Sequence, residues 1–485
     1  RSAIMKKDTT ALTEIIEKGK KYSRRAIKTQ MQLSYNSFMG TNKVDSLLNL
    51  SKEFFIRENF RRFTFERLFW LNSESAYVTH HWINEMMRNP KKGLNDYMFF
   101  TGLPHFYYNT HLPNLKQNAQ FTTSLSNKIK LMEKIDTTYD LDPFWDILKH
   151  QILESELADS LLQSYSYEPK TWESVQSTLG KNDVILFYFE NYHDTHTLEV
   201  TPDTLIFSLI DHYDEIIDRV KDKNIILMDN AYFPKTFERD YFNKVGKAPK
   251  IRMAQDFYRL SNRMLEKEFR TGQFFGTDKA FQFKGDAYTD LFFVEDERNE
   301  LAKHVTLTEK NADILHYSGH FIKSKNHAVY NKFAVDVVDD SLVYYPAYKL
   351  FDTELNGQLV VLNACHSTAH SVMDDFLGQA NFVNAFLNAG ASTVLATNSE
   401  IDDFTSTKLI EQFYKHLFDG VDAVESLRLA KEYIYHNYSK DPKYWATTQL
   451  YGHNFVLKKS WFKLYYLYIL FGICLMFLLR KKLKT

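Results

Sequence analysis

Five short apolar runs constrain the fold of this chain more than any other feature. They read DVILFYF (183–189), NIILMD (224–229), ADILHYS (312–318), QLVVLNA (358–364) and ASTVLAT (391–397). Strands that are apolar along their whole length are typical of parallel sheets buried on both faces. Helical patterns follow the later runs, at 381–390, 405–418 and 424–438. We therefore predict an α/β architecture, with a mostly parallel central sheet between two layers of helices.

The first 170 residues have a different pattern, in which apolar residues recur at helical spacing. The clearest stretches are 10–27 and 142–165, and turn signals such as RNPKKG and LPHFYYN separate the predicted helices. No clean repeat period is visible, although worn helical-hairpin repeats give such a pattern. We predict an all-helical region over 1–170, followed by the α/β domain over 175–457.

The last segment is apolar on all sides. Trp461–Leu479 comprises 19 residues with one charge, Lys463. At ~1.5 Å a residue this length nearly matches the ~30 Å hydrocarbon core of a bilayer. A buried core helix is the alternative, but the terminal position favours a transmembrane helix over 461–479 with a basic tail over 480–485.

Basic residues on both sides of this segment predict its orientation. Lys458, Lys459 and Lys463 lie on one side and four basic residues lie in the tail, a small excess that favours a cytoplasmic C-terminus. The soluble part would then lie outside the cytoplasm, which requires a signal peptide ahead of Arg1, where the sequence begins without an apolar signal region. A tail-anchored protein with a cytoplasmic soluble part is the alternative.

Charge and cysteine content exclude some classes of function. The chain has 60 Lys and Arg against 61 Asp and Glu, a net charge of -1, which gives no electrostatic reason to expect nucleic acid as a partner. Of its two cysteines, Cys474 lies within the apolar C-terminal segment, where packing or lipid contact is its simplest role. Cys365 therefore has no disulfide partner in the soluble part.

Cys365 and His320 are the candidate catalytic residues. Cys365 directly follows QLVVLNA, so it lies where a buried parallel strand leaves the sheet, and open α/β sheets bind ligands at that edge. His320 lies just beyond ADILHYS, with Gly319 loosening the backbone before it. A thiol of pKa ~8.5 is mostly protonated at neutral pH, so it needs an imidazole to form the thiolate. An inert core cysteine is the alternative.

Other histidines near these positions carry simpler interpretations. His316 lies inside the predicted strand, and we interpret it as a packing or hydrogen-bonding residue near the site. His366 and His370 raise the alternative of a metal site with Cys365, because residues at i and i+4 share a helix face. No carboxylate or second cysteine joins them at a suitable spacing, so we predict no metal.

Several blocks of the sequence are informative in their order as well as their composition. They are LFFVEDERNEL (291–301), ILHYSGHF (314–321), LVVLNACHS (359–367), FVNAFLNAGASTVLATNSEIDD (382–403), LIEQFYKHLFDGVDAVESLRLAKEY (409–433) and DPKYWATTQLYG (441–452). In this order they resemble the CHAT peptidase domain, a family related to caspases and separase. The resemblance spans roughly residues 175–457.

The resemblance implies a caspase-like α/β/α sandwich and a cysteine endopeptidase with His320 and Cys365 as its dyad and no cofactor. It also implies that the backbone N–H groups of Cys365 and Phe321 stabilise the oxyanion. Family members commonly carry tetratricopeptide-type repeats ahead of the peptidase, which fits 1–170 as a degenerate repeat region. Some bacterial members also end in a membrane span.

The resemblance also suggests a substrate pocket. The family's W-x-V-x-D element aligns with SEIDD, which puts Asp403 in the S1 pocket and implies a preference for Arg or Lys at P1. A solvated helix N-cap is the alternative for Asp403. The chain departs from the family at Phe321, where Gly is usual and a side chain could crowd the oxyanion site, and at Asn398 and Ser399, which replace Leu-Trp beside the pocket.

These observations predict a membrane-anchored cysteine endopeptidase that cleaves a protein substrate. A protein partner or activator would bind the helical region. The alternative is a catalytically silent caspase-like scaffold that binds protein partners through that region. Retention of His320 and Cys365 favours the enzyme, whereas Phe321 favours the scaffold.

Overall fold

The fold is taken from a computed structural model, which describes residues 88–95, 98, 115–138, 170–190, 195–210, 213–228, 237–254, 260, 264–324, 330–339, 341–368 and 382–458. The predicted transmembrane helix and basic tail lie outside these residues. None of the described helices combines the length and apolar character that crossing a bilayer requires.

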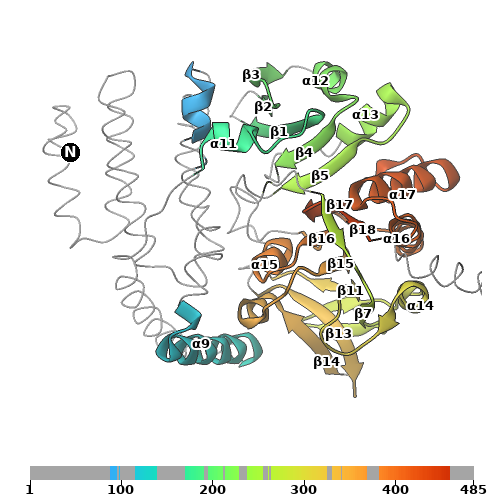
Figure 1. The fold of residues 1–485 in the computed structure, drawn as a ribbon. Helices are drawn as coiled ribbons and strands as arrows, with labels where there is room; N and C mark the ends of the chain where they lie inside the picture. The colour runs from blue at the N-terminus through green and yellow to red at the C-terminus, as the bar shows by residue number, and fades with distance from the viewer. Residues whose placement is uncertain are drawn as a thin grey trace, which may run out of the picture.

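An 11-stranded sheet forms the centre of the molecule (Figure 1). Its strands are β1 (Asp183–Glu190), β2 (Thr195–Val200), β3 (Leu205–Ile210), β4 (Asn224–Met228), β5 (Lys250–Ala254), β7 (Thr271–Phe275), β10 (Thr306–Leu307), β11 (Ile314–Ser318), β15 (Leu359–Asn363), β16 (Thr393–Thr397) and β17 (Thr448–Gly452). Their order across the sheet is β10-β7-β11-β15-β16-β17-β5-β4-β1-β2-β3. The β1–β2, β2–β3 and β16–β17 pairs are antiparallel and the other neighbours are parallel. The predicted mostly parallel sheet is therefore confirmed.

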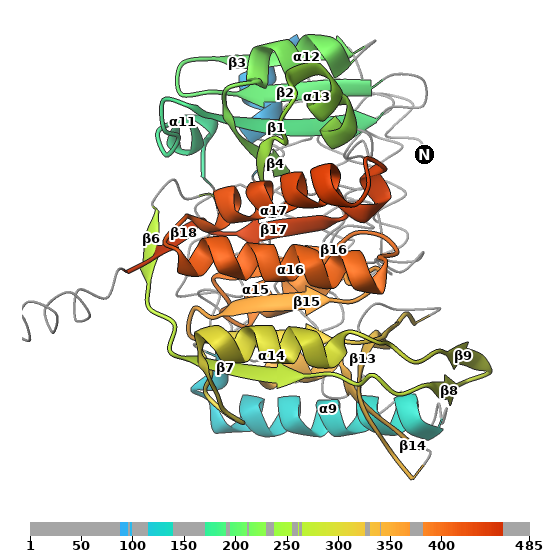
Figure 2. The same ribbon diagram turned by 90° about the vertical axis from the view of Figure 1, so that its right-hand side faces the viewer.

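Helices lie on both faces of this sheet, as Figures 1 and 2 show. They are α9 (Ala119–Thr138), α11 (Trp172–Gln176), α12 (Tyr213–Val220), α13 (Phe237–Val245), α14 (Val294–His304), α15 (Phe382–Asn388), α16 (Asp403–Phe418) and α17 (Ala423–Asn437), with the short 3-10 helices η4 (Ala347–Asp352) and η5 (Pro442–Tyr444). Along the C-terminal half of the sheet, α14, α16 and α17 cover one face and α15 and α9 the other.

Aspartates fix where the last two long helices begin. The Asp402 side chain accepts from the Thr405 N–H at 2.9 Å before α16, and the Asp422 side chain accepts from the Glu425 N–H at 3.0 Å before α17. Each bond satisfies one of the amides that a helix start leaves unpaired. The two helices therefore begin where the sequence predicts them.

Three smaller sheets were not predicted. One contains β12 (Phe321–Ile322), β13 (Lys332–Val338) and β14 (Ser341–Pro346); the second pairs β6 (Leu265–Lys267) with β18 (Phe455–Leu457); the third is a hairpin of β8 (Phe281–Phe283) and β9 (Asp286–Tyr288). The hairpin projects beyond the edge of the central sheet at which its parallel strands end (Figure 2).

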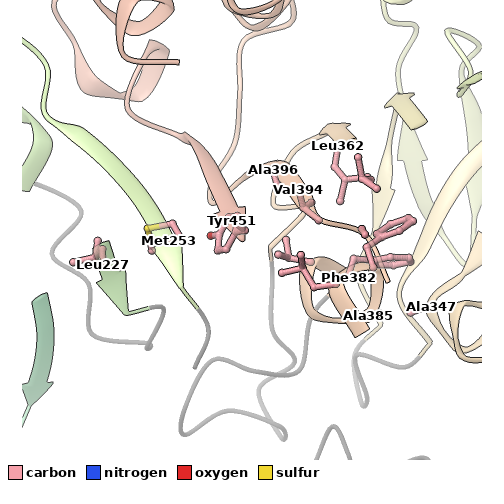
Figure 3. Packing of buried hydrophobic residues seen from close by; sticks show 14 of the residues in the cluster. Leu227, Met253, Ala347, Leu362, Phe382, Ala385, Val394, Ala396 and Tyr451 are labelled. Carbon is pink, nitrogen blue, oxygen red and sulfur yellow. The ribbon is translucent and has the colours of Figure 1, made fainter. Parts of the chain in front are cut away.

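A row of buried side chains crosses the sheet and joins its two halves. Strand register pairs Leu227 with Met253, Met253 with Tyr451, Tyr451 with Val394, and Val394 with Val360. These five residues belong to one hydrophobic cluster, and Figure 3 shows four of them in sequence across the strands. Because paired residues project to the same face, the row makes one continuous core.

The structure describes only a few residues of the predicted N-terminal helical region. α9 is a helix within the predicted region, and it packs Phe121, Leu125 and Met132 into the main core cluster. The stretches 10–27 and 142–165, on which the repeat prediction rested, lie outside the described residues. The degenerate repeat region stays a prediction.

Candidate active site

β11 and β15 bring the two candidate catalytic residues to one edge of the sheet. The strands are parallel neighbours, and Ser318 pairs with Asn363 at their carboxyl ends. The Gly319 N–H continues the ladder by donating to the Asn363 carbonyl at 3.3 Å. His320 and Cys365 each follow that last pair by two residues. Since neighbouring strands lie ~4.8 Å apart, the two residues leave the sheet from adjacent strand ends.

The β8–β9 hairpin holds the imidazole of His320. Phe281 and Tyr288 pair across the hairpin, and their rings stack with centroids 4.5 Å apart. The His320 ring meets both at steep angles, with centroids 5.6 Å from Phe281 and 5.3 Å from Tyr288. Lys284 and Gly285 form the two-residue turn with φ of 54° and 90°, the left-handed conformation that tight hairpins require. The hairpin therefore restricts where the imidazole can lie.

The residue after the hairpin sets which ring nitrogen of His320 carries a proton. Nε2 of His320 lies 2.7 Å from the backbone carbonyl oxygen of Thr289. A carbonyl oxygen can only accept, so Nε2 carries a proton. In the neutral imidazole Nδ1 is then unprotonated and can act as a base.

Two glycines allow the chain to pack tightly before His320. At Gly276, with φ of 148°, a Cβ atom would lie 1.7 Å from the Ser318 carbonyl oxygen. At Gly319, with φ of 156°, it would lie 2.8 Å from the hydroxyl of Tyr317. That hydroxyl also donates to the His320 carbonyl at 2.7 Å. Gly319 thus provides room for a close contact that fixes the backbone at His320.

A buried serine ties the turn that carries Cys365 to the next strand. Ser367 is 0% exposed, and its Oγ accepts from the Thr397 N–H at 2.8 Å and lies 3.2 Å from the Leu362 carbonyl oxygen. The Thr397 hydroxyl donates to the Ala364 carbonyl. These bonds join the end of β15 to the end of β16, so Cys365 lies on a braced turn.

The surroundings of the Cys365 thiol disfavour its ionised form. Cys365 is exposed, and its Sγ contacts the Ile401 carbonyl oxygen at 3.9 Å. Desolvation raises the pKa of the thiol, and the negative charges of Glu400 and Asp403 raise it further. The structure describes the side chains of Cys365 and His320, and no hydrogen bond joins the thiol to the imidazole. Formation of the thiolate at neutral pH is therefore disfavoured unless another group takes the thiol proton.

The side chain of Phe321 packs into the core. It is 9% exposed, and its ring packs against Phe333 and Phe382 at centroid distances of 5.7 and 5.8 Å. Its place in the main core cluster argues against the crowding of an oxyanion site that the sequence suggested.

Strand pairing leaves the Phe321 N–H unused by β13. Phe321 pairs with Phe333, and the Ala334 N–H donates to the His320 carbonyl at 3.1 Å. In an antiparallel ladder, hydrogen-bonded pairs alternate with pairs that do not exchange bonds. His320 and Ala334 form the bonded pair, so the Phe321 N–H points away from β13.

The charge of Asp403 acts on the Cys365 thiol, and its carboxylate also anchors a loop. Its Oδ2 accepts from the Phe292 N–H at 2.8 Å, so the carboxylate holds the loop that leads into α14. Desolvation raises the pKa of Asp403, and the nearby carboxylates of Glu297 and Asp402 add to the shift. The N-cap of α16 is Asp402 and not Asp403, so the N-cap alternative for Asp403 is wrong by one residue.

His316 is fully buried beneath the site, with 0% exposure. Its Nε2 lies 2.9 Å from a carboxylate oxygen of Glu297, and its Nδ1 lies 2.9 Å from the hydroxyl of Tyr414. Both ring nitrogens are occupied, so His316 has no nitrogen left to act on Cys365.

The alternative metal site gains no support from the described residues. His366 is exposed, with φ of 55°, and its backbone N–H donates to the Ser399 carbonyl at 3.0 Å. His370 lies outside the described residues. Within the described ranges, no group of three or more His, Cys, Asp or Glu side chains is arranged to hold a metal ion.

Comparison with known proteins bears on this site. A family model of the CHAT domain matches residues 285–453, which include His320 and Cys365. Comparison with curated proteins yields no match. Two crystal structures of the separase–securin complex of Saccharomyces cerevisiae match at 11% and 12% identity, with TM-scores of 0.30 and 0.31. Each match covers 94% of this chain but only 27% and 28% of the other chain.

The family match defines the class of domain that carries the site. Residues 285–453 match a CHAT domain, and the surrounding fold is α/β with a mostly parallel sheet. The resemblance predicted from the sequence is therefore confirmed for this stretch, which is shorter than the predicted 175–457.

Two contributors to the site were missed by the sequence analysis. One is Thr289, whose role comes from its backbone carbonyl, although the KG pair flanked by FQF and DAY is a recognisable hairpin signal. The other is Glu297, a charged residue in a helix with seven Asp, Glu, Lys, Arg or His among its 11 residues. Nothing in that helix alone distinguishes the buried glutamate from its exposed neighbours.

Proposed function

We propose that the protein is a cysteine endopeptidase in which Cys365 is the nucleophile and His320 the general base. The observation that carries the proposal is the register of β11 and β15, which gives the two residues equal offsets beyond paired strand ends. The contact of His320 Nε2 with the Thr289 carbonyl supports it, because that contact leaves Nδ1 as the basic nitrogen.

The reaction follows from these groups. His320 Nδ1 takes the thiol proton of Cys365 as Sγ attacks the scissile carbonyl, which produces a tetrahedral oxyanion and an imidazolium. The imidazolium then donates its proton to the leaving amine as the C–N bond breaks. A thioester remains on Cys365. Water, deprotonated by the same imidazole, hydrolyses it and restores the thiol.

Two backbone amides support stabilisation of the oxyanion. The Phe321 N–H is not used by the β12–β13 pairing, and the Cys365 N–H belongs to the braced turn after β15. Donors fixed in advance stabilise developing charge most strongly, and losing one costs ~10²-fold or more in rate. The position of the Phe321 ring in the core leaves this role open to its backbone.

We infer a preference for Lys or Arg at P1. The negative charges of Glu400 and Asp403 lie near enough to the thiol to raise its pKa, so the surroundings of the nucleophile are acidic. A cationic P1 side chain gains from such a field, and an Arg gains further from paired hydrogen bonds to a carboxylate. Asp403 is the proposed S1 residue.

A silent scaffold is the second candidate. The raised pKa of Cys365 and its contact with the Ile401 carbonyl favour it, because a neutral thiol held by another partner does not attack a peptide. In that case the protein would act by binding partners through its N-terminal region.

Peptide hydrolysis separates the two candidates. Full-length protein in detergent would be assayed with fluorogenic peptides that carry Lys, Arg, Leu or Asp at P1. We expect cleavage after Lys and Arg, a fall of about 10²–10⁴-fold in His320→Ala, and no cleavage by Cys365→Ala. Cys474→Ser is the matched cysteine control and should remain active. Cleavage that survives Cys365→Ala would exclude the proposed nucleophile.

We also propose that 461–479 anchors the protein in a membrane, with the soluble part outside the cytoplasm. The length, the apolar composition and the flanking basic residues of the segment support this. Fractionation of cells that express the full chain or a chain ending at Lys458 tests the anchor, since only the full chain should sediment with membranes. Protease added to intact cells should remove the soluble part; protection would favour the tail-anchored alternative.

A further inference from the structure

Glu297 makes a set of contacts that the proposed reaction does not use. It lies in the first turn of α14 and is 0% exposed. Its carboxylate meets His316 Nε2 at 2.9 Å, Asn363 Nδ2 at 2.5 Å and the Thr407 hydroxyl at 2.8 Å. A buried carboxylate is costly unless its oxygens accept hydrogen bonds, and here three donors from three different elements converge on it.

Two of these donors lie on the strands that carry the proposed dyad. His316 is in β11, four residues before His320. Asn363 is the last residue of β15, two residues before Cys365. The carboxylate of Glu297 therefore holds both strands from one point close to their carboxyl ends.

The cluster continues into α16. The hydroxyl of Tyr414 lies 2.9 Å from His316 Nδ1, and the Ser406 hydroxyl accepts from Asn363 Nδ2 at 3.4 Å. Burial raises the pKa of Tyr414 well above its ordinary range, so it is neutral and can donate to Nδ1. That arrangement leaves the Nε2 proton of His316 directed at Glu297.

The helix of Glu297, α14, directly follows the loop that holds His320. The Glu297 N–H donates to the carbonyl of Phe293, the residue just before α14, at 3.2 Å. Four residues earlier, the Thr289 carbonyl accepts from His320 Nε2. Moving the start of α14 would therefore move the acceptor that fixes the imidazole.

We propose that Glu297 is a positioning residue whose carboxylate holds β11, β15 and the start of α14 in the relation that lets His320 and Cys365 react. This inference rests on the proposed function, since it assumes that the two side chains work together. A displacement of about 1 Å between reacting groups can cost ~10²-fold in rate, so an anchor shared by both strands has a large effect on reactivity.

A carboxylate suits this position better than an amide. All three contacts on Glu297 are donors, and a carboxylate only accepts. In Glu297→Gln the new NH₂ group would face at least one donor. His316 can accommodate it by switching to the tautomer protonated on Nδ1, with Tyr414 as acceptor, so the variant should fold with altered strand contacts.

Glu238 provides a matched control. It is 2% exposed and bridges α13 to Lys431 on α17, with Nζ–O distances of 2.9 and 2.7 Å, and it also accepts from Gln449. Replacing it by Gln removes the same charge from an equally buried position, but its contacts do not include β11 or β15.

The test uses the alkylation rate of Cys365 by iodoacetamide as a function of pH, in full-length protein that carries Cys474→Ser. Alkylation requires the thiolate but no substrate, so the pH profile reports how the imidazole acts on the thiol. The variants would be His320→Ala, Glu297→Gln and Glu238→Gln. Glu400 and Asp403, which also act on the thiol, are present in all of them.

We expect His320→Ala to abolish the imidazole-dependent part of the profile. Glu297→Gln should lower the rate in that part by about 10-fold or more, whereas Glu238→Gln should keep the wild-type profile at a lower melting temperature. If Glu297→Gln and Glu238→Gln give the same profile, Glu297 is merely structural and the inference is overturned. If His320→Ala already matches the wild type, the dyad itself is excluded, and with it the premise of the inference.

Thr407→Val is a milder second variant. It removes the hydroxyl that donates to Glu297 and that also lies 2.9 Å from the Asp403 carbonyl oxygen, with almost no change in shape, and it leaves the charge in place. A decrease smaller than that of Glu297→Gln but in the same direction supports the proposal even if Glu297→Gln fails to fold. A folded Thr407→Val with an unchanged profile and an unchanged rate would contradict it.

Discussion

The two halves of the central sheet each bury a glutamate, but they neutralise it differently. Next to the N-terminal half (β1 to β5), Glu238 is paired with the ammonium of Lys431, which is itself buried. In the C-terminal half (β7, β10, β11, β15 and β16), Glu297 receives hydrogen bonds from an imidazole, an amide and a hydroxyl. Within the described residues, no Lys or Arg forms an ion pair with Glu297.

The two arrangements do different things: the ion pair only holds elements together, whereas the hydrogen-bonded cluster also fixes their orientation. A buried ion pair holds two elements together, and its loss leaves an uncompensated charge. Neutral donors hold an acceptor through direction, so they fix orientation as well as distance. The ion pair joins two helices of the molecule, whereas the directional cluster lies under the strand ends that carry His320 and Cys365.

Breaking the ion pair between Glu238 and Lys431 should give the largest effect on stability. Lys431→Met removes the ammonium and leaves Glu238 buried without its partner, so we expect a loss of about 3–5 kcal/mol in the free energy of unfolding. Denaturant titration measures this loss. The alkylation profile of Cys365 should stay unchanged in the folded variant, and a changed profile would show that the two halves are coupled through α17.

A smaller loss should follow from weakening the turn that carries the nucleophile. Ser367→Ala removes the acceptor of the Thr397 N–H, a buried group, at a cost of about 1–3 kcal/mol. It should also reduce the reaction of Cys365 with an active-site probe, because the ends of β15 and β16 are no longer joined.

The opposite end of β16 offers the control for this prediction. The Ser392 hydroxyl donates to the Gly357 carbonyl at 2.8 Å, just before that strand begins. Ser392→Ala should lower stability and leave the probe reaction unchanged. If both serine variants affect the probe equally, the bracing role assigned to Ser367 is incorrect.

The smallest effect should come from Asp403→Asn, which is expected to change two reaction rates of Cys365 in opposite directions. The charge of Asp403 raises the pKa of the Cys365 thiol, so Asp403→Asn should lower that pKa and increase the thiolate fraction at neutral pH. Alkylation by iodoacetamide should then accelerate by on the order of twofold, while reaction with a probe carrying Lys or Arg at P1 decreases.

Asp402→Asn is the matched variant for this test. Asn caps a helix about as well as Asp does, and Asp402 is the N-cap of α16. It should change neither rate. Parallel changes of both rates in Asp403→Asn would mean that Asp403 acts on the thiol alone and does not meet the substrate.

The sequence predicted the parts of the fold that depend on local pattern. The runs that became β1, β4, β11, β15 and β16 are apolar along their length, and helical spacing marks the segments that became α16 and α17. The placement of His320 and Cys365 at the same edge of the sheet was predicted from parallel strands alone. These features need no knowledge of distant contacts.

Features that depend on pairing between distant segments could not be predicted. The antiparallel strand β17 lies between β16 and β5, and its sequence TQLYG does not reveal either neighbour. The core position of the Phe321 ring depends on Phe333 and Phe382, which come from later elements. The burial of Glu297 likewise depends on three donors that lie up to 110 residues away.

Covalent labelling tests the dyad most directly. Full-length protein in detergent would be treated with an acyloxymethyl ketone carrying Lys or Arg at P1, and the modified residue would be identified by mass spectrometry in the wild type, His320→Ala and Cys365→Ala. The account predicts an adduct on Cys365 that forms about 10²-fold or more slowly in His320→Ala, and none in Cys365→Ala. Equal labelling of Cys365 with and without His320 would contradict it.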